Sequence, residues 1–149
     1  MQVLLATILF ILLSPGLIFT FPYGEQKGPF VGETTSNLAV LVHGVLFFVI
    51  NKFISAGTWP FNYVNDAVAQ ISTNVHDVPP VLATIAFIVL SPGLIATIPS
   101  FEGQTFFSQE TNTLAILVHA VLFYVLLRLY ADNSNSVIVQ TINNQLNQV

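Results

Sequence analysis

The sequence contains one long apolar segment twice, and each copy is followed by a second apolar segment that also recurs. Residues 3–22 (VLLATILFILLSPGLIFTFP) align with residues 80–99 (PVLATIAFIVLSPGLIATIP), and 14 of the 20 positions are identical. Residues 34–49 align in the same way with residues 110–125, and each of these copies contains one histidine. Apolar composition alone would not reproduce Ser-Pro-Gly and a histidine in both copies. The pattern therefore indicates a duplicated unit of two apolar segments.

The four apolar segments have the length of membrane-spanning helices. Each covers about 17–19 residues, or roughly 26–29 Å of helix, against a hydrocarbon core of about 30 Å. Hydrophobic residues make up 54% of the 149-residue chain and charged residues 7%, too few charges to coat a soluble fold of this size. We therefore predict an all-α membrane protein with four transmembrane helices, at about 3–21, 37–54, 80–98 and 113–131.

These helices are expected to form two tandem hairpin repeats in the same orientation, because a unit that crosses the membrane twice returns the chain to its starting side. The first repeat covers residues 1–57 and the second covers residues 80–131. The linker between them (58–79) and the tail (132–149) carry apolar residues at helical spacing. We expect both to be amphipathic helices at the membrane interface on the side of the two termini. An unstructured polar tail is the alternative for the last segment.

Four residues are candidate interfacial anchors. Lys52 and Arg128 occupy equivalent positions near the end of the second helix of each repeat, and Trp59 and Tyr63 follow in the linker. Basic and aromatic side chains gather at the membrane–water boundary. By the positive-inside rule, the side that holds Lys52, Arg128 and both termini is cytoplasmic.

A Ser-Pro-Gly sequence interrupts the first helix of each repeat. A proline inside a helix removes an N–H donor and frees the carbonyl four residues earlier, here at Ile11 and Ile88. In lipid such a carbonyl needs another partner, and a serine hydroxyl can bond to its own preceding turn. We therefore predict a kink in each first helix. The residues concerned are Ser14, Pro15 and Gly16 in the first repeat and Ser91, Pro92 and Gly93 in the second.

One histidine in each second helix is predicted to lie at the depth of the kink. His43 follows Asn37 by six residues, and Pro15 precedes Phe21 by six; His119 has the same relation to its own proline. In antiparallel neighbours this spacing brings each ring to the kink of its repeat, about 9 Å from the interface. We expect the two histidines to hydrogen-bond the serine hydroxyl or the freed carbonyl. A proton or ion role, or one metal site shared by both rings, is the alternative.

The sequence lacks the patterns of soluble enzymes and of nucleic-acid-binding proteins. It has no cysteine, no nucleotide-binding loop and no paired carboxylates. Only three residues are basic, so the chain cannot hold a nucleic acid electrostatically. We expect no catalytic activity, no cofactor and no metal.

The segment LSPGLI…P followed by LAVLVH(G/A)VLF resembles small hydrophobic proteins encoded by large DNA viruses of algae and other protists. The resemblance covers both repeats, and it implies a component of the virion's internal membrane or minor capsid layer with no catalytic residues. The two copies differ at Gly44, which stands where the second copy has Ala120. We expect that exchange to be trivial.

The sequence therefore predicts a structural membrane protein, located in a host-derived virion membrane, that links the bilayer to a capsid or another large assembly. Its expected partners are lipid and other proteins, with a homo-oligomer as one possible form. One alternative is a small oligomeric channel or transporter whose path is lined by His43 and His119. Another is an accessory subunit of an energy-transducing membrane complex.

Overall fold

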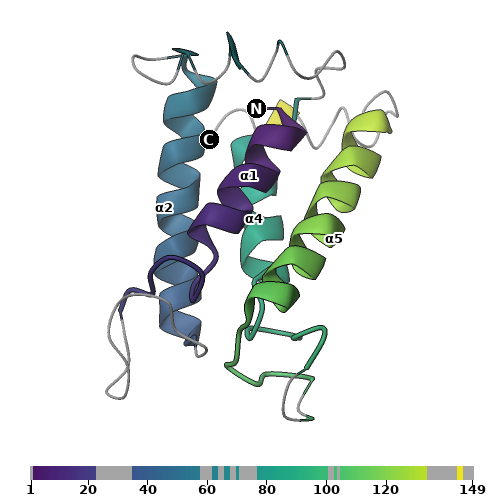
Figure 1. Ribbon diagram of the computed structural model, residues 1–149. Helices are drawn as coiled ribbons and strands as arrows, with labels where there is room; N and C mark the ends of the chain where they lie inside the picture. Colours follow the sequence, from purple (N-terminus) through teal and green to yellow (C-terminus); the bar gives the residue numbers. More distant parts are fainter. Residues whose placement is uncertain are drawn as a thin grey trace.

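The computed structural model describes residues 2–22, 35–57, 62–63, 66–67, 70, 77–100, 103, 105–133 and 144–145. Within these residues the fold is helical, which confirms the predicted all-α class. The four long helices form one bundle in which α1 and α4 begin at the end where α2 and α5 finish (Figure 1). They are α1 (Val3–Leu13), α2 (Asn37–Ser55), α4 (Pro80–Leu90) and α5 (Thr113–Asp132).

The two second helices of the predicted hairpins begin with matching side-chain caps. The Ser36 hydroxyl accepts a hydrogen bond from the N–H of Ala39 at 3.1 Å, and the Asn112 side-chain oxygen accepts one from the N–H of Ala115 at 2.7 Å. Such caps satisfy N–H groups that have no partner inside the helix. α2 and α5 contain 19 and 20 residues and are long and apolar enough to cross a membrane.

The two first helices are shorter than the sequence predicted. α1 ends at Leu13 and α4 at Leu90, each eight residues before its expected end. The proline that follows disfavours helical backbone in the preceding residue, and Ser14 and Ser91 accordingly have extended backbone with ψ of 124° and 125°. The predicted kink is therefore wrong, because each Ser-Pro-Gly sequence stops its helix.

The helices pack most closely between the predicted hairpins. α2 lies mainly against α4 and α1 mainly against α5, whereas the helices within one hairpin pack less closely. Gly44 permits the approach of α2 to α4, since a Cβ added there would lie 2.7 Å from Cγ1 of Ile88. We expected the exchange of Gly44 for Ala120 to be trivial, and this expectation was wrong. The exchange sets how closely one pair of helices can pack.

One phenylalanine from each helix fills the centre of the bundle: Phe10, Phe47, Phe87 and Phe123, each 0% exposed. Phe10 stacks on Phe123 with ring centroids 4.7 Å apart, and Phe47 stacks on Phe87 at 4.6 Å. The two stacked pairs meet edge to face at 5.4 and 6.1 Å. Both geometries are favourable for aromatic rings. Each stacked pair joins helices from different halves of the chain, so the core holds the halves together.

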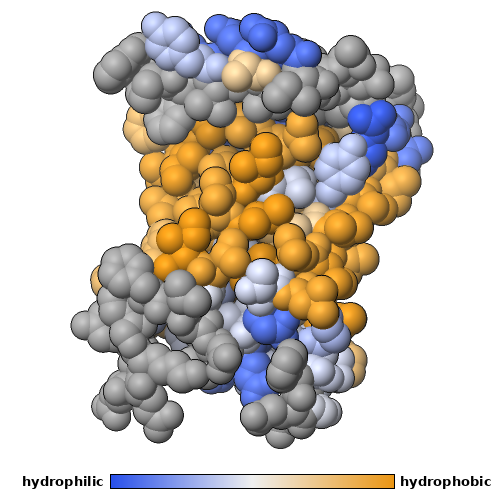
Figure 2. Space-filling model, viewed as in Figure 1, coloured by the Kyte–Doolittle hydropathy of each residue, from blue (hydrophilic) through white to orange (hydrophobic). Residues whose placement is uncertain are grey.

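The face of the bundle seen in Figure 2 is apolar between two more polar ends. Val45 on α2 and Val121 on α5 are 64% and 63% exposed, and most of the outward side chains along the middle of these helices are also aliphatic. A helix that is apolar all round is buried in protein or surrounded by lipid. The large exposed aliphatic side chains are Leu38, Leu41, Val45, Leu46 and Val49 on α2 and Leu114, Leu117, Val121, Leu122, Val125, Leu126 and Leu129 on α5.

Most of the linker and tail lies outside the described residues. The amphipathic helices predicted for 58–79 and 132–149 therefore stay predictions, as does the role of Trp59. Tyr63 is described, and its side chain is exposed.

Candidate functional site

The His43 ring bridges the two ends of the turn that follows α1. Its Nδ1 lies 2.7 Å from the carbonyl oxygen of Leu13, and its Nε2 accepts a hydrogen bond from the N–H of Phe21 at 3.1 Å. Because Nε2 accepts, the geometry assigns the proton to Nδ1, which donates to Leu13. The side chain is 1% exposed. One neutral imidazole thus closes a loop of the backbone.

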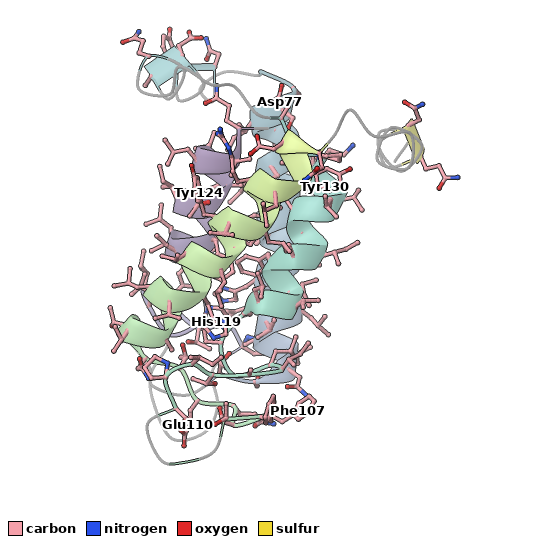
Figure 3. All side chains as sticks on the ribbon, turned by 90° about the vertical axis from the view of Figure 1, so that its right-hand side faces the viewer. Asp77, Phe107, Glu110, His119, Tyr124 and Tyr130 are labelled. Atoms are coloured by element: carbon pink, nitrogen blue, oxygen red, sulfur yellow. The ribbon has the colours of Figure 1, made fainter. Side chains whose placement is uncertain are left out.

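His119 makes the same pair of bonds in the second half. Its Nδ1 lies 2.7 Å from the carbonyl oxygen of Leu90, and its Nε2 accepts from the N–H of Ile98 at 3.2 Å. The ring is buried, and it lies at the end of the bundle where the loop that carries Phe107 and Glu110 begins (Figure 3). We call the two units, residues 13–21 with His43 and residues 90–98 with His119, the histidine-bridged turns.

The serine of each turn satisfies another carbonyl at the helix end. The Ser14 hydroxyl donates to the carbonyl of Phe10 at 2.6 Å, and the Ser91 hydroxyl donates to that of Phe87 at 2.7 Å. The last four carbonyls of a helix have no partner within it. Serine and histidine together therefore satisfy two of these groups at the end of α1 and two at the end of α4.

The partners differ from those that the sequence led us to expect. We expected each histidine to bond the serine hydroxyl or the carbonyl of Ile11 or Ile88. Because the helix stops at the serine, the Ile11 carbonyl instead accepts the N–H of Ser14 at 3.3 Å. The histidine bonds the carbonyl of the last residue of the helix, Leu13 or Leu90. Each histidine nevertheless lies beside the turn of its own half.

Glycine in the second turn is required by both backbone and packing. Gly93 has φ of +91°, and a Cβ there would lie 2.5 Å from Cγ2 of Thr35 and 2.9 Å from the carbonyl oxygen of Glu110. Thr35 also donates its N–H to the carbonyl of Gln109 at 2.7 Å. The residue that precedes the first-half cap is thus held against the second-half turn. Gly16, the equivalent residue in the first turn, has φ of +95°.

The second turn continues into a short antiparallel ribbon that no sequence pattern predicted. The N–H of Thr97 donates to the carbonyl of Thr105 at 2.8 Å, that of Phe107 to Ile95 at 3.1 Å and that of Gln109 to Gly93 at 3.2 Å. The alternation typical of strands is absent from residues 105–109, which explains why the pattern did not predict pairing.

The chemistry that this arrangement supports is structural. Each ring uses both nitrogens on backbone groups, so neither ring has a lone pair left for a metal ion in this arrangement. Among the described residues, no group of three or more His, Cys, Asp or Glu could hold a metal ion. His43 and His119 are bonded within their own turns and not to each other.

The predicted cationic anchors lie near the opposite end of the bundle from the histidines. Lys52 places its Nζ 5.8 Å from the centroid of the Phe48 ring, and Arg128 Nε lies 3.2 Å from a carboxylate oxygen of Asp132. Both cations therefore lie along the surfaces of their own helices.

Asn51 is a buried polar residue that sequence reasoning passed over. It is 0% exposed, and neither its amide oxygen nor its amide nitrogen has a hydrogen-bond partner in the described part of the chain. The equivalent position in the second half is Leu127, which is 1% exposed. One half therefore buries an unpaired amide where the other buries an aliphatic side chain.

A family model described as "Protein of unknown function (DUF3339)" matches residues 1–55 and 71–132, and these two stretches contain all four helices. No curated protein and no solved structure matches the chain.

Proposed function

The chain belongs to the DUF3339 family, whose members are described as proteins of unknown function, and we propose that it is a structural integral membrane protein. The observation that carries this proposal is the apolar outer surface of the bundle (Figure 2). Val45, Val121 and Leu126 are all more than half exposed, on faces directed away from the core. Soluble monomers rarely expose a contiguous apolar patch above a few hundred Å². Lipid around the bundle would remove the free-energy cost of exposing this apolar surface to water.

The first helices are too short to cross the membrane alone, and the turns that follow them supply the rest of each crossing. Eleven residues of α1 or α4 rise only roughly 16–17 Å, about half of a hydrocarbon core. The remaining depth is covered by residues 14–22 and 91–99. Irregular backbone at membrane depth is tolerated only where protein satisfies its polar groups. We propose that His43 and His119 serve this purpose, so that the chain crosses the bilayer four times with two segments that are half helix and half turn.

The bundle is built as a rigid scaffold. The stacked phenylalanines join the halves at the centre, and Thr35 joins them at the histidine end. We propose that this scaffold holds its loops in fixed positions for other proteins of a larger membrane assembly. The location in a virion membrane stays a prediction, because the matching family is described without a function. The role as an accessory subunit of an energy-transducing complex stays a prediction for the same reason.

A membrane-extraction experiment tests the embedding. After expression in a host membrane, the full chain should remain in the pellet during alkaline carbonate extraction and leave it only with detergent. A chain that stays a dissolved, compact monomer in detergent-free buffer would overturn the proposal.

A flux experiment separates the scaffold from the channel. Vesicles that contain the purified chain should pass protons and potassium no faster than protein-free vesicles, because the ring nitrogens are occupied. A flux that disappears in His43→Leu and His119→Leu variants that still fold would replace the scaffold with a channel.

A further inference from the structure

The loop that precedes α5 presents two neighbouring phenylalanines to the surroundings. Phe106 and Phe107 are 68% and 70% exposed, the highest values of any large apolar side chain among the described residues. Phe107 lies in the loop beyond the histidine end of the helices (Figure 3). An exposed aromatic pair at one point of a largely polar loop marks a surface made for contact.

The backbone holds this pair in one place. The N–H of Phe107 donates to the carbonyl of Ile95, and the flanking bonds of Thr97 with Thr105 and of Gln109 with Gly93 close the ribbon on both sides. The Ser108 hydroxyl lies 2.8 Å from the Thr97 hydroxyl. The two rings are thus displayed on a hydrogen-bonded frame.

The displayed conformation is also strained. Phe107 and Gln109 have φ of +50° and +55°, a region that a bulky side chain rarely adopts. Strain of this kind persists only when surrounding bonds impose it, and it gathers at functional positions. Here the ribbon and Ser108 impose it.

An apolar pair recurs at the same place in the first half of the sequence. Phe106 precedes the helix cap Asn112 by six residues, and Phe30, followed by Val31, precedes the cap Ser36 by six. The residues between pair and cap are polar in both copies, apart from the glycine at position 32.

We propose that Phe106 and Phe107 form a membrane anchor whose rings insert into the interfacial layer of the bilayer at the histidine end of the bundle. Ile95 and Ile98, which are 39% and 48% exposed, continue the apolar surface of the helices onto the turn beside Phe107. Aromatic rings favour the boundary between hydrocarbon and headgroups. The opposite end of the bundle carries the predicted cationic anchors Lys52 and Arg128. The anchor rests on the proposed membrane embedding.

Single-tryptophan fluorescence tests the anchor in the full chain. Trp59 is the only tryptophan, so W59F removes the background and F107W or F106W places one probe on the loop. Both positions are exposed and accept the larger ring. The variants are reconstituted in phosphatidylcholine vesicles that contain lipid brominated either near the carbonyl end or near the methyl end of its chains.

At both loop positions we expect blue-shifted emission, a larger loss of emission with the shallow bromine than with the deep one, and little quenching by aqueous acrylamide. V121W on the outer face of α5 is the matched control, and it should be quenched most by the deep bromine. If V121W responds in this way while both loop probes are quenched only by acrylamide, the rings lie in water and are left for a protein partner. This result would overturn the anchor but not the proposed membrane embedding. If neither brominated lipid quenches V121W, the membrane embedding itself is wrong.

Discussion

The two halves of the bundle make the same hydrogen bonds at their turns but differ in the side chains that pack between the helices. Each turn has a histidine that joins a helix-end carbonyl to the N–H of the eighth residue beyond it, and each has a serine bonded to the carbonyl four residues back. By contrast, Gly44 faces Ile88 where the second half has Ala120, and Asn51 is buried where the second half has Leu127.

The comparison teaches which features tolerate change. Neither difference between the helices, glycine against alanine or asparagine against leucine, changes the partner of a backbone polar group. A buried carbonyl and a buried N–H need their particular partner, and leaving one unpaired costs about 1–3 kcal/mol. The turn bonds are therefore identical in the two halves, while the packing between the helices differs.

The largest expected effect is the loss of either histidine. His43→Leu and His119→Leu each leave one carbonyl and one N–H unpaired, so we expect each to lower the free energy of unfolding by about 2–6 kcal/mol. The two losses should be similar because the two sets of bonds are similar. Denaturant titration in detergent micelles measures both.

The control for this pair is His43→Gln with His119→Gln, which keeps one donor and one acceptor in each turn and should recover part of the loss. A variant of one histidine that unfolds like the parent chain would break the equivalence of the two turns.

The next effect concerns the contact between the halves. Gly93→Ala combines a positive φ with a clash against Thr35 and a backbone carbonyl, and we expect a loss of about 2–4 kcal/mol. Gly103→Ala is the matched control, because Gly103 has φ of +85° and no atom within 4 Å of an added Cβ. It should lose only about 1 kcal/mol, the conformational cost alone. Equal losses would show that Thr35 does not pack tightly on the second turn.

The smallest effect sharpens the difference between the halves. Asn51→Leu gives the first half the residue that the second half has at Leu127, and it removes a buried amide that has no partner among the described residues. We expect the free energy of unfolding to rise by about 1–2 kcal/mol. Asn51→Ala removes the same amide without filling the space, so it separates the polar cost from packing. Destabilisation by both variants would mean that the amide has a partner in the folded protein.

Residue spacing predicted where the histidines lie relative to the turns. It could not predict how the helices pack, because packing depends on which helix faces meet. The distance from Pro15 to the end of its apolar run and that from Asn37 to His43 placed the ring at the turn of its own half. The helix stop was readable from the residue before proline, but the apolar run beyond Pro15 outweighed that signal. The closer packing of α2 with α4 was not readable, because helices that are apolar all round carry no preferred face.

The candidate site was predictable in its members and not in its bonds. Ser14 and His43 were identified from their polarity in an apolar segment, whereas their acceptors depend on where α1 ends. Asn51 escaped attention because one amide near the end of a long helix resembles an interfacial residue. Only the packing of α2 shows that it is buried.

The packing of α1 against α5 has a consequence for how the protein is made. The two helices begin at Val3 and Thr113, so the ribosome adds more than a hundred residues before the final neighbour of α1 exists. At 5–20 residues per second this takes roughly 5–20 s. During that interval the face of α1 that packs against α5 must be covered by lipid or by the insertion machinery. Completion of the bundle is therefore delayed until its last helix arrives.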